Sequence, residues 1–467
     1  MTVELTIAAA LEATGGELLH RGGGGGIRGL SIDSREVEPG QAFVAISGDR
    51  FDGHDFWRKA TDAGARLLVV QQDFGEDVPA GIAVIRVRDT RQALGRLARA
   101  WRREVAPEAV VAVTGSVGKT TTKELVRALL ASLGETHCNP GNFNNDIGLP
   151  LTLLSMPRAT RYLVAEMGMN APGEIAYLTS LAEPDIGVVT CVAPVHLEGL
   201  GTIEAIADAK GELLRGMRGG AWAVVPGDEP LLRSSLAGIP EDRLLRFGGR
   251  PSDDVRVVDA EARSAGTRVR LDLRGEEVIF DLPLVGLHNA RNAAAAAGAA
   301  LVVGLAPARI ARVLEQPPKE LAHRSAVARV GSWRVLDDCY NANPLAMQAA
   351  LDTLAQLAAA EGAQALAVLG DMLELGVDSE WYHREVGRYA ASAGLSLLVA
   401  VGELGAAIAD GARDAGMPPE QVVAVATPGE AARVVAREAP PEAWVLVKAS
   451  RGARLEAVIT ALGDESR

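Results

Sequence analysis

The sequence predicts an α/β protein made of three segments. Strand and helix patterns alternate along residues 109–320 and again along 321–467, which is typical of mostly parallel sheets with helices on both faces. The nonapeptide TGSVGKTTT at 114–122 places a glycine-rich turn between an apolar strand pattern and a helical one. The chain of 467 residues has room for two to four domains, and prolines at 107 and 317–318 predict boundaries that give 1–108, 109–320 and 321–467.

Composition excludes several classes of function. Apolar residues make up 48% and charged residues 23%, as in an ordinary soluble protein. The net charge of −13 argues against a nucleic-acid partner or an anionic membrane surface. The first residues lack the basic stretch of a signal peptide, and no apolar run is long enough to span a membrane. Three widely spaced cysteines suggest reduced thiols, so we expect a cytoplasmic protein without membrane insertion.

The first segment has short strand patterns and two helical ones. Its elements are expected to be a helix at 7–14, a polyglycine loop at 22–26, strands at 42–46, 67–70 and 83–87, and a helix at 90–103.

The second and third segments predict the strands and helices of two further sheets. In the second we expect strands at 110–113, 162–165, 186–190 and 221–225, and helices at 119–133, 203–217 and 289–303. In the third we expect a helix at 345–359 and strands at 333–336, 365–369, 396–401 and 444–447. Ligands of such sheets gather at the carboxyl ends of the strands, where this chain repeatedly places polar residues.

The glycine-rich turn predicts a phosphate cradle. Backbone N–H groups of the turn and of the helix N-terminus face an anion, Lys119 adds a point charge, and the Thr120 hydroxyl can bind Mg²⁺. The cradle comprises Gly115, Ser116, Val117, Gly118, Lys119, Thr120 and Thr121. The loop is the shortened form G-x-x-G-K-T, so a turn without a ligand is the alternative. The strand and helix on either side favour ATP or GTP.

Other polar residues have both a functional and an ordinary interpretation. Glu166 can hold Mg²⁺ or be a solvated acid at a strand end. His196 also ends a strand and can be a ligand or structural. By position alone Lys210 is a solvent-facing helix lysine. The turn NPGNFNND at 139–146 can hold a polar ligand or satisfy its own backbone.

Two further groups stand where a helix is expected to begin. The cluster of Asn289 and Asn292 suits a nucleotide or caps its helix, and Asn343 after Tyr340 and Asn341 can cap the next one.

Several of these stretches together resemble one family. TGSVGKTT, GNFNNDIGLP, AEMGMN, VAPVHLEGLG, DAKGELL, GLHNARNAAAA, DDCYNANP, LGDMLELG and LVKASRG occur in the order and approximate spacing of the Mur ligases. The likeness covers nearly the whole chain, including DSR and FDGHDF in the first segment. It implies a small α/β domain for a UDP-sugar, a central P-loop ATPase domain with a mostly parallel sheet, and a C-terminal Rossmann-like domain.

The resemblance also implies an activity. The motifs GNFNND, DCYNANP and GDMLELG resemble those of the Mur ligases that join D-alanyl-D-alanine to UDP-N-acetylmuramoyl-tripeptide. The resemblance implies a reaction that uses ATP and Mg²⁺ and passes through an acyl phosphate. Its rivals are the ligase adding the third amino acid, a folylpolyglutamate synthase-like enzyme, and a nucleotide-switch protein without ligase activity. We expect a monomer.

The same likeness assigns roles to individual residues. It implies nucleotide contacts at Asn289, Asn292, Arg324 and Asp338 beside the glycine loop. It implies catalytic roles for Lys119, Glu166, His196 and Lys210, and metal ligation by Thr120, Glu166, His196 and a carbamylated Lys210. Substrate contacts are implied at Ser34, Arg35, Asn142, Asn145, Tyr340, Asn341, Lys448 and Arg451. Arg35 suits a pyrophosphate because its fork donates two hydrogen bonds, although a surface Asp33–Arg35 pair is the alternative.

Overall fold

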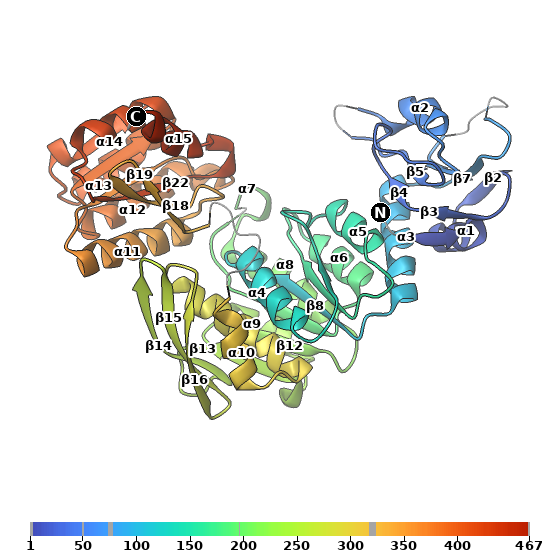
Figure 1. Ribbon diagram of the computed structural model, residues 1–467, viewed down its shortest axis with the longest axis horizontal. Coiled ribbons are helices and arrows are strands. Elements are labelled where there is room, and N and C mark those ends of the chain that lie inside the picture. The colour runs from blue at the N-terminus through green and yellow to red at the C-terminus, as the bar shows by residue number, and fades with distance from the viewer. Residues whose placement is uncertain (1–2, 49–50, 73–77, 196, 317–323, 466–467) are drawn as a thin grey trace.

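Three α/β bodies follow one another along the chain in the computed structural model (Figure 1). The structure describes residues 3–48, 51–72, 78–195, 197–316 and 324–465. The first body lies at one end, the central body in the middle and the third at the other end (Figure 1). The predicted linker at Pro317-Pro318 lies outside the described residues.

The first body is a small mixed sheet flanked by helices. Its five-stranded sheet has the order β2-β7-β6-β5-β4, parallel except for β2 against β7, and β1 pairs with β3 beside it. The strands are β1 (Glu4–Thr6), β2 (Glu17–Arg21), β3 (Gly26–Arg28), β4 (Leu30–Ser31), β5 (Ala42–Val44), β6 (Leu67–Val70) and β7 (Ala83–Arg86). The helices are α1 (Ile7–Thr14), α2 (Trp57–Asp62) and α3 (Thr90–Val105).

Helix α3 belongs to the packing of both the first and the central bodies. Its buried residues Leu94, Leu97 and Trp101 share one hydrophobic cluster with residues of both bodies. Trp101 Nε1 donates to the carbonyl of Met156, 3.0 Å away. The Glu183 carboxylate at the end of α6 (Glu174–Ala182) pairs with three arginines of α3, Arg99, Arg102 and Arg103. The first two bodies are therefore joined by a common core as well as by the chain.

The central body is a nine-stranded sheet of order β16-β15-β14-β13-β12-β11-β8-β10-β9. All neighbours are parallel except β14 with β15 and β15 with β16, which extend the sheet as an antiparallel edge. The strands are β8 (Ala109–Thr114), β9 (Thr136–Cys138), β10 (Tyr162–Glu166), β11 (Ile186–Val189), β12 (Trp222–Pro226), β13 (Leu244–Gly248), β14 (Val255–Arg263), β15 (Gly266–Leu273) and β16 (Glu276–Leu282).

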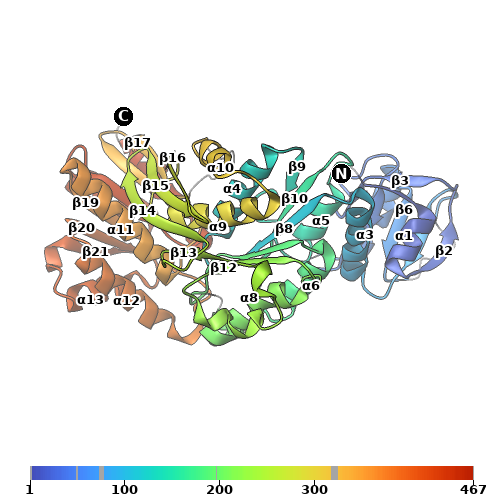
Figure 2. The same cartoon turned by 90° about the horizontal axis from the view of Figure 1, so that it is seen from below.

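Helices cover both faces of the central sheet. Successive side chains of a strand point to opposite faces, so an apolar strand needs packing partners on both. Val111 and Val113 face the cluster with α4 (Lys119–Ala131), α9 (His288–Val303) and α10 (Pro307–Leu314). Val110 and Ala112 face the cluster with α5 (Gly148–Leu154), α6 and α8 (Ile203–Gly216). Figure 2 shows these two layers on either side of the sheet. The short helix α7 (Leu197–Leu200) precedes α8.

The third body is a six-stranded sheet of order β17-β18-β22-β19-β20-β21, parallel except for the β17–β18 pair. Its strands are β17 (Ala326–Val330), β18 (Trp333–Asp337), β19 (Ala365–Leu369), β20 (Leu397–Val401), β21 (Val422–Val425) and β22 (Trp444–Lys448). Its helices are α11 (Pro344–Glu361), α12 (Ser379–Ser392), α13 (Gly405–Asp414), α14 (Pro428–Glu438) and α15 (Glu456–Glu465). Helices α11, α12 and α13 pack on one face and α14 and α15 on the other.

Every helix and strand expected from the sequence is present, with ends that differ by at most two residues. The polyglycine stretch is a turn up to Gly25, and Gly26 already belongs to β3, where it pairs with Thr6. The antiparallel edge formed by β14, β15 and β16 was not expected from the sequence. No helix among the described residues is long and apolar enough to cross a lipid bilayer.

Candidate active site

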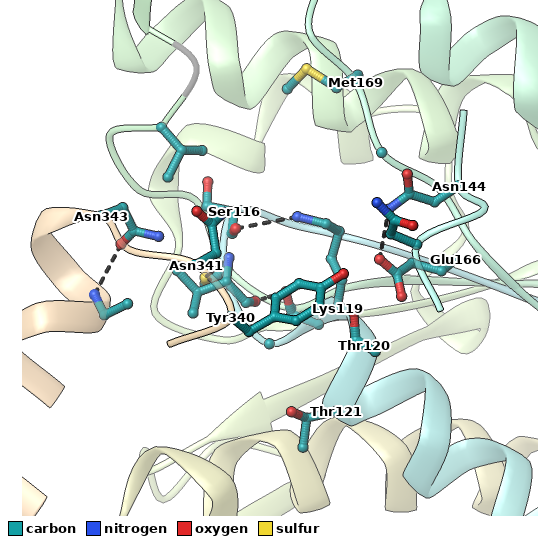
Figure 3. A pocket seen from close by; sticks show the side chains of 18 of the residues that line it. Ser116, Lys119, Thr120, Thr121, Asn144, Glu166, Met169, Tyr340, Asn341 and Asn343 are labelled. Atoms are coloured by element: carbon teal, nitrogen blue, oxygen red, sulfur yellow. Dashed lines mark hydrogen bonds between the residues drawn. The ribbon is translucent and has the colours of Figure 1, made fainter. Parts of the chain in front are cut away.

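A cleft of about 1610 Å³ lies between the central and third bodies and collects most of the predicted site residues. It is lined by Ser116, Val117, Gly118, Lys119, Thr120, Thr121, Asn142, Asn145, Glu166, Asn289, Asn292, Arg324, Asp338, Tyr340, Asn341, Lys448 and Arg451. They lie where strands of two different sheets end and where the following helices begin. This agrees with the expectation that ligands gather at the carboxyl ends of the strands. Figure 3 shows part of this cleft.

The glycine loop is held in shape by the segment that follows the neighbouring strand β11 (Ile186–Val189). The Ser116 hydroxyl donates to the Ala193 carbonyl at 2.9 Å and accepts from the Ala193 N–H at 2.8 Å. The Thr190 hydroxyl donates to the Val117 carbonyl at 2.5 Å. A Cβ atom on Gly115 would lie 1.9 Å from the Thr190 hydroxyl oxygen, so this residue must be glycine. The loop is therefore a preformed cradle at the start of the 13-residue helix α4.

Lys119, the first residue of α4, turns back over its own loop (Figure 3). Its ammonium donates to the carbonyls of Gly115 at 2.7 Å and Ser116 at 3.3 Å. Burial lowers the pKa of Lys119, while the charge of Glu166 raises it. The charge thus lies over the cradle, close to where phosphate oxygens would be held.

Glu166 at the end of β10 is buried, with 2% of its surface exposed, so the solvated-acid alternative is wrong. Its Oε1 accepts a hydrogen bond from Asn144 Nδ2 at 2.8 Å (Figure 3). Its Oε2 is buried and has no hydrogen-bond partner among the described residues. One carboxylate oxygen that lines the cleft therefore remains available for a cation.

The first turn of α9 packs directly against the glycine loop. Asn292 donates to Asn289 Oδ1 at 3.0 Å, and Asn289 donates to the Val285 carbonyl at 2.9 Å. Neither asparagine caps the helix, whose N-cap is Leu287, so the simple capping alternative is wrong. Gly118 has φ +83°, and a Cβ there would lie 2.3 Å from Asn292 Oδ1. The two asparagines therefore form part of the wall around the cradle.

The third body reaches the cradle through Arg324. Its guanidinium donates to the Thr120 hydroxyl at 2.9 Å and lies 3.7 Å from the centre of the Tyr340 ring. Arg451 lies over the same ring at 5.9 Å. These contacts place two cations of the third body beside the phosphate loop of the central body.

Asp338 and the buried Lys448 form an ion pair at the carboxyl ends of β18 and β22, two inner strands of the third sheet. Lys448 also donates to the Asn341 carbonyl at 3.0 Å, and only 2% of its side chain is exposed. Asp338 accepts from the Ser325 N–H at 2.9 Å. Asn343 accepts from the Ala346 N–H at 2.9 Å and caps α11, as its ordinary interpretation predicts. In this structure the pair fixes the strand ends that carry Tyr340 and Asn341.

Lys210 on α8 is buried, with 1% of its surface exposed, so the solvent-facing alternative is wrong. Burial lowers its pKa well below the ordinary value, and the charge of Lys119 lowers it further. Among the described residues, no hydrogen bond or ion pair of Lys210 is recorded, and it is not among those that line the cleft.

Some predicted residues are not brought to the cleft. His196 lies outside the described residues. Ser34 and Arg35 belong to the first body, where Arg35 is largely exposed and pairs with Asp33 at 2.6 Å. This pair holds the pKa of Asp33 at about 2. The ion pair proposed as the alternative is therefore present, and the role of Arg35 in substrate binding remains a prediction.

Several cleft residues were not singled out from the sequence. They are Asn144, Asp146, Tyr177, Asp228, His288, Arg291 and the loop 373–375. Asp146 pairs with Arg91 of α3 at 3.1 Å, and Arg291 pairs with Asp228. The sequence identifies the turn 139–146 and the stretch that begins at His288 as polar. Which of their side chains line the cleft depends on long-range packing. Of the asparagines in the turn 139–146, only Asn142 has no recorded side-chain hydrogen bond in the described structure.

Comparisons with known proteins agree along the whole chain. The models of the Mur ligase middle domain, the Mur ligase glutamate ligase domain and the Mur ligase family catalytic domain match residues 113–300, 323–451 and 26–102. The UDP-N-acetylmuramoyl-tripeptide–D-alanyl-D-alanine ligase of Bacillus subtilis is 36% identical over 93% of this chain and 92% of the relative. The ligase of the same name from Escherichia coli is 35% identical over 99% of both chains.

Solved structures give the same result. The crystal structure of MurF from Acinetobacter baumannii matches with a TM-score of 0.89 and 30% identity over 99% of both chains. MurF ligase from Thermotoga maritima in complex with ADP matches with a TM-score of 0.84 and 29% identity, over 94% of this chain and 98% of that one. The chain therefore belongs to the Mur ligase family and, within it, to the MurF ligases.

Proposed function

We propose that this protein is the ATP-dependent ligase that joins D-alanyl-D-alanine to UDP-N-acetylmuramoyl-tripeptide. The products are UDP-N-acetylmuramoyl-pentapeptide, ADP and phosphate. The observation that carries the proposal is the cleft itself, where a preformed phosphate cradle of the central body faces Arg324, Tyr340 and Asn341 of the third body. Full-length likeness to MurF ligases selects this reaction among those that such a cleft can perform.

The glycine loop is suited to bind the ATP phosphates. Its backbone is held by hydrogen bonds to Thr190 and Ala193, and α4 directs its positive end toward the loop. Lys119 needs only to exchange its two carbonyl partners for phosphate oxygens. Arg324 is close enough to the loop to add a second positive charge. Charge neutralisation matters because the peptide carboxylate that attacks the γ-phosphate is itself an anion.

The residues present fit a divalent cation at Glu166. Among the described residues, the buried Glu166 Oε2 has no hydrogen-bond partner, and it is an oxygen ligand of the kind that Mg²⁺ prefers. The Thr120 hydroxyl at the start of α4 keeps one oxygen lone pair beside the hydrogen bond that it accepts from Arg324. We propose that Thr120 and Glu166 hold one Mg²⁺, and that His196 and a carbamylated Lys210 hold a second. Bound Mg²⁺ would neutralise phosphate charge. Burial that favours the neutral amine of Lys210 supports carbamylation, which requires that form.

The two-body cleft explains how an amide bond can be made in water. Attack of the tripeptide carboxylate on the γ-phosphate gives an acyl phosphate and ADP, and the amine of D-alanyl-D-alanine then displaces phosphate. The acyl phosphate must be kept from water until the amine attacks. The third body supplies one wall of the cleft and touches the cradle through Arg324, so it can close this space.

The proposal also assigns substrate contacts and domains. Ser34 and Arg35 bind the uridine diphosphate end in domain 1–108, and domain 109–320 binds ATP. Domain 321–467 contributes Tyr340, Asn341, Lys448 and Arg451 to the substrates, while Asn142 and Asn145 bind from the central domain. Because nucleotide-linked precursors and ATP are cytoplasmic compounds, the enzyme is proposed to act in the cytoplasm, as a monomer.

Phosphate release measured with each substrate in turn tests the proposal. Release should require ATP, the UDP-linked tripeptide and D-alanyl-D-alanine together. A parallel assay with lysine and diaminopimelate tripeptides identifies the preferred third residue. Release without D-alanyl-D-alanine would indicate a nucleotide-switch protein. Release with the UDP-linked dipeptide and a single amino acid would indicate the ligase for the third residue. Either result overturns the proposal.

A further inference from the structure

Residues of the asparagine-rich turn that follows β9 hydrogen-bond both the backbone and the carboxylate of Glu166. Asn139 Oδ1 accepts from the Glu166 N–H at 2.6 Å, and Asn139 Nδ2 donates to the Glu166 carbonyl at 3.1 Å. Asn144 Nδ2 donates to the carboxylate Oε1 at 2.8 Å, and the Asn144 carbonyl accepts from the Gly168 N–H at 2.8 Å. Two residues of one turn therefore hold both the backbone and the side chain of Glu166.

The same turn is tied to the helix of the phosphate cradle. Lys123, one helical turn after Lys119, donates to the Asn139 carbonyl at 2.8 Å and is 1% exposed. Its charge is balanced by Glu124 at 2.9 Å, which also pairs with Arg127 at 2.7 Å. A buried lysine is costly, so its partners must be well placed. This chain of contacts fixes Glu166 relative to α4.

We infer that Asn144 is a positioning residue that makes Glu166 a one-oxygen metal ligand, with Asn139 and Lys123 fixing the backbone beneath it. Asn144 occupies Oε1, so only the unpaired Oε2 is left for the cation. The rotation of the carboxylate is thereby set before a metal binds. The inference rests on the proposed metal-binding role of Glu166.

There is little room for another arrangement of this side chain. A Cβ atom on Gly168 would lie 2.9 Å from Asn144 Oδ1 and from its Cγ. Asn144 is thus confined between the backbone at Gly168 and the Glu166 carboxylate. Loss of a group that orients a metal ligand typically lowers metal affinity by about 10 to 100-fold.

The test measures Mn²⁺ affinity of the full-length protein with ADP, by electron paramagnetic resonance of the free ion. Asn144→Leu keeps the approximate size of the side chain and removes the donor. We expect it to weaken Mn²⁺ binding about 10-fold or more. ADP affinity measured without metal should be unchanged. The matched control is Asn170→Leu, at an exposed asparagine of the same cleft whose side chain makes no hydrogen bond to any residue that the structure describes. It should leave both affinities as they are.

A double variant separates positioning from direct ligation. If Asn144 acts through Glu166, then Asn144→Leu should have no further effect on Mn²⁺ affinity in a Glu166→Gln background. Additive losses would mean that Asn144 itself contacts the metal, and would overturn the inference. Unchanged Mn²⁺ affinity in Asn144→Leu, beside a clear loss in Glu166→Gln, would also overturn it.

Two further measurements keep the result unambiguous. If Asn144→Leu melts at a lower temperature than the wild type, Asn144→Ala replaces it, because the smaller side chain makes no new contact. If Glu166→Gln itself leaves Mn²⁺ affinity unchanged, the metal-binding role in the proposed function is wrong, and the inference falls with it. Normal substrate-dependent phosphate release in that variant would show that the ligase assignment stands independently.

Discussion

Replacing Gly118 by alanine should weaken nucleotide binding by a predictable amount. Gly118 ends the phosphate loop with φ +83°, a conformation that costs an L-residue about 1–2 kcal/mol. The new Cβ would also lie 2.3 Å from Asn292 Oδ1, so Asn292 must move. Moving Asn292 breaks its hydrogen bond to Asn289, worth about 1 kcal/mol. The unliganded variant relieves this strain by relaxing its loop, and ADP must restore the cradle in order to bind. The total of about 2–3 kcal/mol then corresponds to roughly 30 to 150-fold in affinity, since about 1.4 kcal/mol is tenfold.

Calorimetric titration of ADP into Gly118→Ala checks this expectation without requiring turnover. Gly238→Ala is the control, because that glycine has no positive φ and a Cβ added to it would have no atom within 4 Å. Its ADP affinity should equal that of the wild type. ADP affinity of Gly118→Ala within threefold of wild type, in a protein with a normal melting temperature, would refute the reasoning about the loop.

Five other variants test the remaining assignments. Lys119→Ala should leave the fold intact and lower the rate about 10² to 10³-fold, because a charge at the transferred phosphate is lost; full activity in a folded variant would contradict the cradle. Arg35→Ala should raise the Michaelis constant for the UDP-linked substrate, and an unchanged constant would leave only the surface ion pair with Asp33. Lys210→Ala and Lys210→Arg should both be nearly inactive, with small carboxylates partly rescuing only the alanine variant; an active arginine variant would exclude a carbamate. For Glu183, whose pKa the arginines of α3 lower from 4.5 to about 2, the ionised form stabilises the fold above pH 4.5, and this contribution is lost as pH falls toward 2. Glu183→Gln should therefore have a lower urea midpoint at pH 7 than wild type and a smaller difference at pH 3; a difference independent of pH would contradict this.

The parts that could be predicted from the sequence are those with local causes. A glycine loop between a strand and a helix has a backbone requirement that the residues themselves reveal, and Gly115 and Gly118 satisfy it here. Apolar strands separated by helical stretches likewise predicted the two large sheets. Asn343 could be recognised as a cap because a capping side chain acts within three residues of itself.

The partners of Glu166 could not be chosen from the sequence because they act over a distance. Asn144 and Asn139 lie 22 and 27 residues from Glu166, and the contact exists only because β9 and β10 are neighbours in the sheet. The composition of the turn 139–146 predicts that its amides can form hydrogen bonds. It does not predict which amide faces a carboxylate and which faces solvent.

Lys210 shows a signal that was present in the sequence. It lies on α8 at the spacing of the buried Ile206 and Leu213, four residues after one and three before the other. A lysine among the apolar residues of one helix face is expected to be buried, so this spacing predicts burial of Lys210 without any resemblance to a protein family. The antiparallel edge could also have been found, since Val269, Leu271 and Leu273 alternate with polar residues along β15.

The core shared through α3 has a consequence for how the enzyme selects its substrate. Because Trp101 and the arginines around Glu183 pack α3 onto the central body, direct packing sets the separation between the first body and the phosphate loop. If Arg35 holds the uridine end, as proposed, the reacting carboxylate must lie at a set distance from it, and this separation would limit the length of substrate that can react. A UDP-linked peptide of the right length would then present its terminal carboxylate to ATP, whereas a shorter one would end before the reacting phosphate.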